Sequence, residues 1–463
     1  MRSNIKKVFW FYLLLFLILI IYILFFSFFN SKKIIGNPYN PRVTKSQNNN
    51  IIRGSILDRN LNVLVETKDN RVYNYDNVFA HTIGFINNGG YGIESKYNFD
   101  MQTLNNELIQ RFNKEFNKDY KLQANSLVLT LDKDLQNFCY EKLKDKNGAI
   151  VVMDSTTGKI LAMVSSPSFN PNNISNDWNN LINDTKNNPL VNRATQGLYP
   201  PASVFKILTS ATFIENYEDF ENYTYTCKGY ETFGDIKIEC FDKKAHGNLN
   251  LEKALAVSCN SFFANLSNLI TPEQLAETAN KALFNNSLNF TLEYNKSSFT
   301  LDNTSPIDEI IQTYIGQGKT LVTPLHIALI GSSIANNGIM MTPYIVESKL
   351  DYKGNVIDKN LPKKLTNAFS IETAQTIKNM LEKVVTEGTG KKAKLDNISI
   401  SAKTGTAQVD SQKDHTWFLG MAPTENPNIV VSIIFENSGE NSNIVEVARD
   451  IIDFAKPMLN KVE

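Results

Sequence analysis

Three short polar motifs along the chain carry the residue types that serine acyl transfer needs. Ser203 precedes Lys206 by three positions, Ser258 precedes Asn260 by two, and a third motif spans Lys403–Thr406. Residues three apart on a helix share one face, so the Lys206 amine would lie within reach of the Ser203 hydroxyl. A lysine amine whose pKa is lowered by burial beside a second cation can take the proton of such a hydroxyl. The motifs therefore indicate a nucleophilic serine, Ser203, with Lys206 as its base.

The segment before Ser203 predicts that its hydroxyl lies at the amino-terminal end of a helix. Pro200 and Pro201 suit the start of a helix and not its interior, and apolar residues follow Ser203 at helical spacing. The helix dipole favours negative charge at that end, which would help a serine oxygen that is losing its proton. Lys403 is the second cation that we expect beside Lys206.

The third motif has a β pattern, so Lys403 and Gly405 should face one way and Thr404 and Thr406 the other. Gly405 has no side chain to obstruct a neighbouring extended peptide. Such a peptide could add to this strand through main-chain hydrogen bonds, with specificity from the surrounding pockets. The motif therefore predicts a peptide-binding strand.

Hydrophobic periodicity predicts an α+β fold in which an antiparallel five-stranded sheet, flanked by helices, positions these motifs. A turn that contains Gly158 joins the first two strands as a hairpin. Helical patterns fill the stretch before the last three strands, as an α-helical lobe inserted into the sheet would require. The expected strands are 149–153, 160–164, 398–409, 415–421 and 429–436, with an earlier strand at 127–131 and a closing helix at 445–459.

An apolar run from Val8 to Phe29 predicts a transmembrane helix. It would be roughly 33 Å long as a helix, and a bilayer core is about 30 Å thick. No small-residue cleavage site follows the run, which favours a retained anchor over a signal peptide. Basic residues before the run outnumber those after it, so the amino terminus is expected in the cytoplasm. These residues are Arg2, Lys6 and Lys7 before the run, and Lys32 and Lys33 after it.

The chain divides into five predicted regions. Proline and a run of asparagines after the anchor favour an extended linker, and the motifs above all fall in the long carboxy-terminal region. The expected boundaries are a cytoplasmic tail at 1–7, a transmembrane anchor at 8–29, a linker at 30–50, a pedestal domain at 51–125 and a main domain at 126–463.

The charge balance excludes one class of partner. The chain has 47 basic and 47 acidic residues, whereas a nucleic-acid-binding protein needs an excess of positive charge to displace counterions from phosphate. We therefore expect no nucleic-acid partner.

The four cysteines are too few for a disulfide scaffold. Cys227 and Cys240 bracket a short β-rich segment and could pair across a hairpin, or could form a zinc site with the nearby His246 and Asp242. The spacing matches no standard zinc motif. Free, partly buried thiols are the favoured interpretation, and no metal and no cofactor are predicted.

The three motifs in this order resemble those of the penicillin-binding proteins and class A β-lactamases. The segment Arg53–Asn60 extends the match upstream, and residues 30–126 are too few for the glycosyltransferase domain of class A penicillin-binding proteins, so the chain resembles class B. The resemblance covers roughly Arg53 to Glu436, and it departs at Ala202 and Ala402, where relatives usually have glycine. Further family-like stretches are Gly90–Glu94, Asn192–Pro201, Gly316–Gly318, Thr323–Leu325, Glu387–Gly390 and Trp417–Gly420.

The resemblance implies that 126–463 is a penicillin-binding transpeptidase domain with Ser203 as its nucleophile. By the same resemblance, Ser258 relays a proton to the leaving amine, and Asn260 bonds Lys206 and the substrate amide. Lys403 helps to hold the substrate carboxylate and tune the proton relay. The Thr404 and Thr406 hydroxyls contact that carboxylate. The backbone N–H groups of Ser203 and Thr406 form the oxyanion hole.

The leading hypothesis is a peptidoglycan D,D-transpeptidase in the bacterial cell membrane, single-pass with its catalytic domain outside. It would cross-link stem peptides that end in D-Ala-D-Ala and be acylated by β-lactam antibiotics. Water as the acceptor would make it a D,D-carboxypeptidase. Family analogy adds a multi-spanning membrane glycan polymerase as a partner, and the sequence does not choose among roles in cell division, elongation that sets cell shape, and sporulation.

Three other classes compete with this hypothesis. A β-lactamase of class A would need an E-x-x-L-N loop, which is missing between the second and third motifs. A β-lactam sensor would need more membrane helices or an output domain, for which the short tail leaves no room. A scaffold for a membrane partner with a secondary catalytic role stays open.

Overall fold

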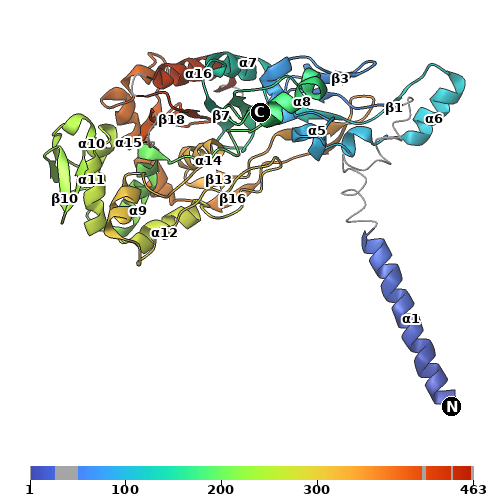
Figure 1. The fold of residues 1–463 in the computed structure, drawn as a ribbon, viewed down its shortest axis with the longest axis horizontal. Helices are drawn as coiled ribbons and strands as arrows, with labels where there is room; N and C mark the ends of the chain where they lie inside the picture. The colour runs from blue at the N-terminus through green and yellow to red at the C-terminus, as the bar shows by residue number, and fades with distance from the viewer. Residues whose placement is uncertain (1, 27–50, 409–412, 440–441, 460–463) are drawn as a thin grey trace.

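The computed structural model describes residues 2–26, 51–408, 413–439 and 442–459 (Figure 1). Within these residues, one helix is long and apolar enough to cross a membrane: Ile5–Phe25, inside α1 (Arg2–Phe25). The side chains of Ile5–Phe25 are exposed, as expected of a segment that packs against lipid. The predicted linker at 30–50 lies outside the described residues.

The main domain is built on a fully antiparallel five-stranded sheet, as predicted. Its strands are β7 (Gly148–Asp154), β8 (Ile160–Ser166), β17 (Ser401–Ala407), β18 (His415–Ala422) and β19 (Ile429–Phe435), in the order β17-β18-β19-β7-β8. The three central strands are apolar on both faces because helices cover both sides. The strand β17, which carries the third motif, lies at the edge.

Helices on the two faces of this sheet form two separate cores. The apolar helix α14 (Pro324–Ala335) packs on one face, while α7 (Lys133–Leu143) and α16 (Ile444–Leu459) pack on the other. Figure 1 shows the sheet between these layers, with α7 and α16 together on one side. The helix α15 (Ile371–Thr386) runs beside β17. Alternate residues of β7 divide between the two cores, as the pleat of a strand requires.

The predicted helical lobe lies between β8 and β17 in the sequence. It contains α9 (Lys206–Asn216), α10 (Leu251–Ala256), α11 (Asn260–Asn265), α12 (Pro272–Lys281) and α13 (Ile307–Tyr314). Two small hairpin-like ribbons project from it. The first pairs β9 (Tyr225–Cys227) with β12 (Gly247–Leu249), and the second pairs β10 (Tyr230–Phe233) with β11 (Ile236–Glu239).

A second sheet, of six strands, joins the pedestal to a distant part of the chain. Its order is β15-β14-β6-β2-β3-β4. The strand expected at 127–131, which we had placed in the main domain, is β6 (Ser126–Leu129) of this sheet, and β14 and β15 come from residues far along the sequence. The remaining strands are β2 (Ile56–Leu57), β3 (Val63–Thr67), β4 (Arg71–Tyr73), β14 (Val346–Leu350) and β15 (Val356–Lys359). The pedestal is therefore completed by a segment that lies between α14 and α15.

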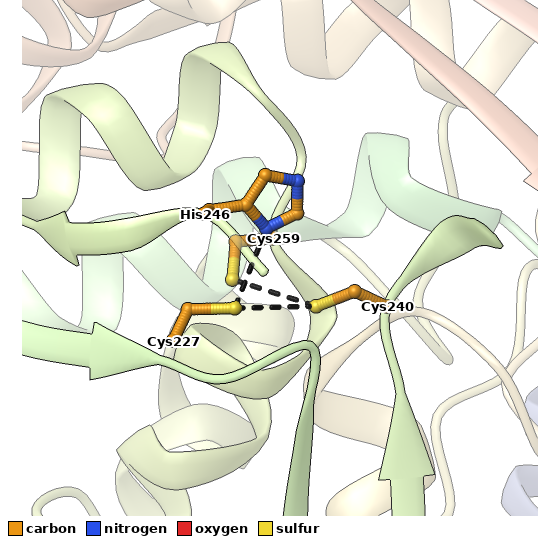
Figure 2. A group of neighbouring side chains, drawn as sticks. All are labelled: Cys227, Cys240, His246 and Cys259. Carbon is orange, nitrogen blue, oxygen red and sulfur yellow. Dashed lines mark hydrogen bonds between the residues drawn. The ribbon is translucent and has the colours of Figure 1, made fainter. Parts of the chain in front are cut away.

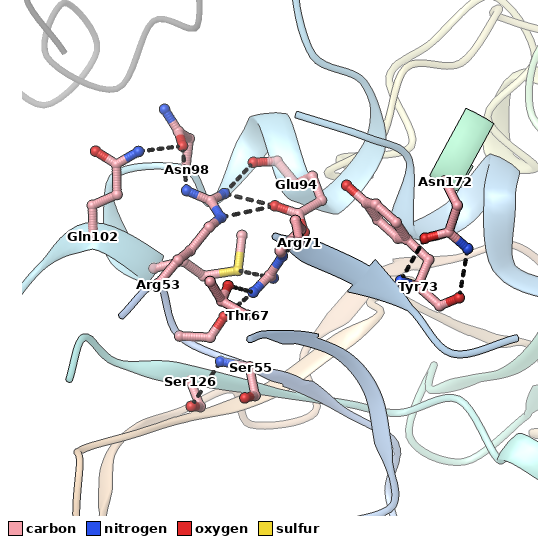
Figure 3. A network of polar contacts seen from close by, with 12 residues as sticks. Arg53, Ser55, Thr67, Arg71, Tyr73, Glu94, Asn98, Gln102, Ser126 and Asn172 are labelled. Carbon is pink, nitrogen blue, oxygen red and sulfur yellow. Dashed lines mark hydrogen bonds and ion pairs between the residues drawn. The ribbon is translucent and has the colours of Figure 1, made fainter. Parts of the chain in front are cut away.

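A buried ion-pair network holds the pedestal together (Figure 3). Glu94 is fully buried, and its two carboxylate oxygens accept hydrogen bonds from Arg53 at 2.7 Å and from Arg71 at 2.7 Å. Arg53 also donates to Asn98 at 2.6 Å, and Arg71 donates to the carbonyl of Gly54 at 2.7 Å. Burial alone would raise the pKa of Glu94, but the two guanidinium groups lower it. The two family-like stretches that the sequence showed near residues 53 and 94 therefore meet in one charged core.

Glu94→Gln should destabilise the pedestal strongly. It leaves two buried guanidinium groups without a compensating charge, which typically costs about 3–5 kcal/mol. Urea unfolding of the full-length protein in detergent at neutral pH measures the change. Glu66→Gln is the control, since Glu66 pairs with Lys68 at the surface and its loss should cost less than about 1 kcal/mol. Equal losses in the two variants would show that the Glu94 network does not stabilise the pedestal.

Candidate active site

Ser203 lies in the short helical turn that leads into α9. It is the second residue of the 3-10 helix η5 (Ala202–Phe205), and α9 begins at Lys206. Ser203 therefore sits at a helix amino terminus, as the two preceding prolines predicted. Its side chain is half-buried, and its hydroxyl forms no hydrogen bond with any residue that the structure describes. The oxygen is thus free to face a substrate.

The turn before Ser203 packs closely against two glycines, Gly405 and Gly316. Ala202 has φ of 52°, in the left-handed region. A Cβ atom added at Gly405 would lie 3.1 Å from the Cβ of Ala202 and 3.3 Å from the backbone nitrogen of Ser203. A Cβ added at Gly316 would lie 1.8 Å from the carbonyl oxygen of Ala202. The sequence pattern predicts a substrate strand in the space beside Gly405. The structure instead places the turn before Ser203 in that space.

Four of the predicted site residues meet in one hydrogen-bond network. The Lys206 amine donates to the Asn260 side-chain oxygen at 2.7 Å and to the Ser258 carbonyl at 2.9 Å, and it lies 3.4 Å from the Ser258 hydroxyl. The Lys403 amine donates to the Ser258 hydroxyl at 2.9 Å and to the carbonyl of Thr404 at 2.9 Å. Ser258 therefore bridges the two lysines, which come from α9 and from β17.

Both lysines are buried, and neither has a carboxylate partner among the residues that the structure describes, which lowers their pKa values. Burial lowers the pKa of Lys206 to about 8, against a smaller opposing effect of the Cys259 and Cys240 thiols. Burial and the charge of Lys206 lower the pKa of Lys403. In the neutral form, Lys206 uses both N–H bonds on Asn260 and Ser258. Its lone pair is then available to accept a proton.

The outer side of β17 presents hydroxyl groups at the edge of the sheet. Thr404 is half-buried and Thr406 exposed, whereas Lys403 and Gly405 are buried, so the predicted alternation holds. The Thr404 hydroxyl is 2.6 Å from that of Thr389. Thr389 lies in the family-like stretch Glu387–Gly390, from which no role for this hydroxyl is predicted. A hydroxyl placed here from another segment could not be found from spacing along the chain.

Polar anchors fix the segment that leads to Ser203. The Trp417 indole donates to the carbonyl of Pro200 at 2.9 Å, and the Tyr199 hydroxyl donates to Glu436 at 2.5 Å. Arg193 donates to the same carboxylate oxygen at 2.9 Å. These side chains come from the Asn192–Pro201 and Trp417–Gly420 stretches and from the end of β19. These hydrogen bonds therefore fix the segment before Ser203 against the five-stranded sheet.

Three cysteines and a histidine gather beside the second motif. Cys227, Cys240, His246 and Cys259 each offer one ligand atom, and these atoms lie within 4.8 Å of one another. The suggested disulfide is not formed, because the sulfurs of Cys227 and Cys240 are 3.7 Å apart and both thiols are free. A disulfide bond is about 2.05 Å long. Asp242, which the zinc hypothesis included, is not in the group.

The fold and the site place a serine at a helix start beside two buried lysines and an edge strand, an arrangement typical of a serine acyltransferase. The chain belongs to the family described as the penicillin-binding protein transpeptidase domain, which it matches over residues 148–453. It is 26% identical to the peptidoglycan D,D-transpeptidase MrdA of Acinetobacter baumannii over 448 residues, which is 85% of this chain and 67% of that protein. The chain thus spans about two thirds of the length of that relative.

Solved structures show the same fold. The D,D-transpeptidase domain of a peptidoglycan glycosyltransferase from Eggerthella lenta matches with a TM-score of 0.80 and 29% identity, over 89% of this chain and 99% of that one. Penicillin-binding protein A from M. tuberculosis, solved as an imipenem acyl-enzyme complex, matches with a TM-score of 0.81 and 24% identity, over 88% and 99%. The predicted fold class and the resemblance to class B penicillin-binding proteins are confirmed. The same matches confirm the prediction of a D,D-transpeptidase domain.

Proposed function

We propose that this chain is a membrane-anchored peptidoglycan D,D-transpeptidase that works through a Ser203 acyl-enzyme. The observation that supports this most directly is the network of Lys206, Ser258, Asn260 and Lys403 at the start of α9, directly after the turn that carries Ser203. A serine hydroxyl with no hydrogen bond to any described residue, a base with a lowered pKa and a proton relay are the parts that acyl transfer needs. The relatives are named peptidoglycan D,D-transpeptidases, and the family resemblance implies that the substrate is a stem peptide that ends in D-Ala-D-Ala.

Acylation would begin with proton transfer from Ser203 to the neutral amine of Lys206. The serine oxygen then forms a bond to the carbonyl carbon of the penultimate D-alanine, and the oxyanion is stabilised by the backbone N–H groups of Ser203 and Thr406. The bond to the terminal D-alanine breaks as the Ser258 hydroxyl protonates the leaving amine. Lys403 can return a proton to Ser258 through its 2.9 Å hydrogen bond.

The substrate would lie along β17 as an additional strand. Edge strands offer unpaired main-chain groups to an extended peptide, and β17 is the edge strand of its sheet. The terminal carboxylate would then contact the Thr404 and Thr406 hydroxyls, with Thr389 beside them. A β-lactam carries a carboxylate and a strained amide in a similar arrangement. It would therefore acylate Ser203 and stay attached.

The anchor would place this chemistry outside the cell. The span at Ile5–Phe25, with more basic residues before it than after it, favours a single-pass topology with a cytoplasmic amino terminus and an extracytoplasmic catalytic domain. A transpeptidase of this kind needs glycan strands from another enzyme. We propose a multi-spanning membrane glycan polymerase as the partner, in contact with the anchor and pedestal.

Cross-linking of a stem-peptide substrate tests this function. The full-length protein in detergent, supplied with uncross-linked peptidoglycan strands, should release D-alanine and produce peptide dimers in equal amounts, because each acyl transfer to an amine releases one D-alanine. Mass spectrometry of the digested product measures both. Pretreatment with penicillin should remove both products.

Other outcomes would identify the competing functions. D-alanine release without dimers would show a carboxypeptidase. Penicillin that is hydrolysed and released within seconds would show a β-lactamase. A protein that makes no product and takes no penicillin label would support the scaffold hypothesis.

A further inference from the structure

The helix α6 (Glu107–Phe116) exposes a row of large apolar side chains on the pedestal. Leu108 is 85% exposed, Ile109 51%, Phe112 63% and Phe116 78%. Residues three and four apart share one face of a helix, so these four side chains form one apolar stripe. Among the side chains that the structure describes outside α1, no other helix exposes more than one large apolar residue. A contiguous patch of this kind marks an interaction site.

The opposite side of α6 packs on the pedestal through a polar side chain. Gln110 is fully buried, and its amide donates to the carbonyl of Asn105 at 2.9 Å and to that of Gln123 at 3.0 Å. The side-chain oxygen of Gln110 accepts the backbone N–H of Gln123 at 2.8 Å. A helix on a water-soluble domain buries its apolar face, whereas α6 buries a polar residue and exposes its apolar stripe. These hydrogen bonds fix the helix in that orientation.

The chain enters the pedestal from the apolar span at a point beside α6. The first pedestal strand, β1 (Ile51–Ile52), pairs with β5 (Leu122–Gln123), which follows α6 and contacts it. Figure 1 shows α6 next to β1 at one end of the molecule. Residues 27–50 join β1 to the span, and a chain of this length reaches at most roughly 85 Å. The span therefore keeps a bilayer within reach of α6.

Basic side chains accompany the apolar stripe. The segment 107–121 has four basic and three acidic residues, so its net charge is slightly positive. Anionic lipid headgroups attract basic residues beside a membrane, but the small net charge leaves most of the binding to the apolar stripe. A contact that is tethered by a membrane span needs little affinity of its own. The basic residues are Arg111 and Lys114 on α6, and Lys118 and Lys121 after it.

A lipid surface fits these features. An amphipathic helix with leucine and phenylalanine on one face and basic residues around it lies in the plane of a bilayer, with its apolar face among the headgroups and the first acyl carbons. We propose that α6 is an interfacial helix whose apolar stripe inserts into the membrane that holds α1. The pedestal then has two attachments to the bilayer, the span and α6.

The second attachment would orient the catalytic domain. α6 lies at one end of the molecule, and α10 and α11, which flank the second motif, lie at the other end (Figure 1). A docked α6 would hold the lobe away from the bilayer. This consequence rests on the proposed function, because only a peptidoglycan substrate lies on that side of the membrane.

Photo-cross-linking in a bilayer tests the contact. The full-length protein, with the photoreactive p-benzoylphenylalanine in place of Phe112, is reconstituted in vesicles of phosphatidylethanolamine and phosphatidylglycerol. Illumination should join this side chain to a lipid acyl chain, which mass spectrometry of the digested protein detects. The same replacement at Phe241 is the matched control, because Phe241 is 60% exposed but lies in the lobe. Lipid adducts at position 112 should exceed those at position 241 at least about tenfold.

Loss of the apolar stripe should remove the contact. Leu108→Asp combined with Phe116→Asp should lower the lipid adduct at position 112 at least about tenfold. Both side chains are exposed, so the pedestal should stay folded.

Three results would overturn the proposal. The first is equal lipid adducts at positions 112 and 241, and the second is an adduct at position 112 that survives both aspartates. The third is cross-linking from position 112 to residues 27–50 or to another protein molecule in place of lipid, which would assign the apolar stripe to a protein partner. None of these measurements uses acylation of Ser203, so failure here would leave the proposed function standing.

Discussion

Ser203→Ala should abolish covalent labelling by penicillin and leave the fold intact. Without the hydroxyl there is no oxygen to form the acyl-enzyme, and loss of a nucleophile of this kind typically lowers turnover by about a millionfold. Stability should hardly change, because the Ser203 hydroxyl makes no hydrogen bond with the described residues. Alanine also has the highest helix propensity of all residues. Incubation of the full-length protein with a fluorescent penicillin, followed by peptide mass spectrometry, measures the label and its position.

Ser210→Ala is the control for this experiment. Ser210 lies on α9, the helix that follows Ser203, and its buried hydroxyl has no hydrogen-bond partner in the part of the chain that the structure describes. The substitution is chemically the same, so labelling should match that of the wild type. Label that persists in Ser203→Ala, or that maps to another serine in the wild type, would refute the assignment of the nucleophile.

The sequence indicates the residues of the candidate site more fully than it indicates their surroundings. The order and spacing of the motifs, with the family resemblance that they carry, single out Ser203, Lys206, Ser258, Asn260 and Lys403, and the structure brings the last four into one network. Each motif sets its own local geometry: a helix start, a loop that enters a helix, and a strand. The contacts between motifs then follow from the fold that the strand pattern indicated.

Contacts between distant segments were not predictable in the same way. The pairing of β14 with β6 joins residues 346–350 to residues 126–129, and nothing in either short strand identifies its partner. Likewise Thr389 reaches Thr404 from a loop after α15. Pairing partners of short strands and loop hydroxyls depend on tertiary packing, and one sequence does not reveal that packing.

The cysteines illustrate the same limit. The spacing of Cys227, Cys240 and His246 matches no known zinc motif and favours free thiols. The spacing of the second motif predicts that Cys259 points away from Ser258 and Asn260 and is structural, but it does not connect Cys259 with the other cysteines and the histidine. The structure shows that the Cys259 side chain points towards the other three side chains (Figure 2). None of the standard zinc spacings includes a residue of a catalytic motif, so spacing alone does not reveal this group.

Lys206→Ala should slow penicillin acylation by about a hundredfold to ten-thousandfold, the range that a positioned general base contributes. The amine is buried and hydrogen-bonded to Asn260 and Ser258, so its removal also leaves both acceptors without their donor. Rapid-quench measurement of the labelling rate gives the effect on chemistry. Lys378→Ala is the control, since Lys378 is another largely buried lysine with a lowered pKa, and it should leave the rate unchanged.

The dependence of the rate on pH separates a role as base from a role in packing. Only the neutral amine of Lys206 accepts a proton, and its pKa is about 8. The rate of acylation in the wild type should therefore be constant above about pH 9 and should fall by about tenfold per unit below about pH 7. In Lys206→Ala this fall should disappear from the residual rate, whereas a group that acts only by packing would lower the rate equally at every pH. A wild-type rate that does not change over this range, or a residual rate that keeps the same fall, would assign the proton transfer to another group.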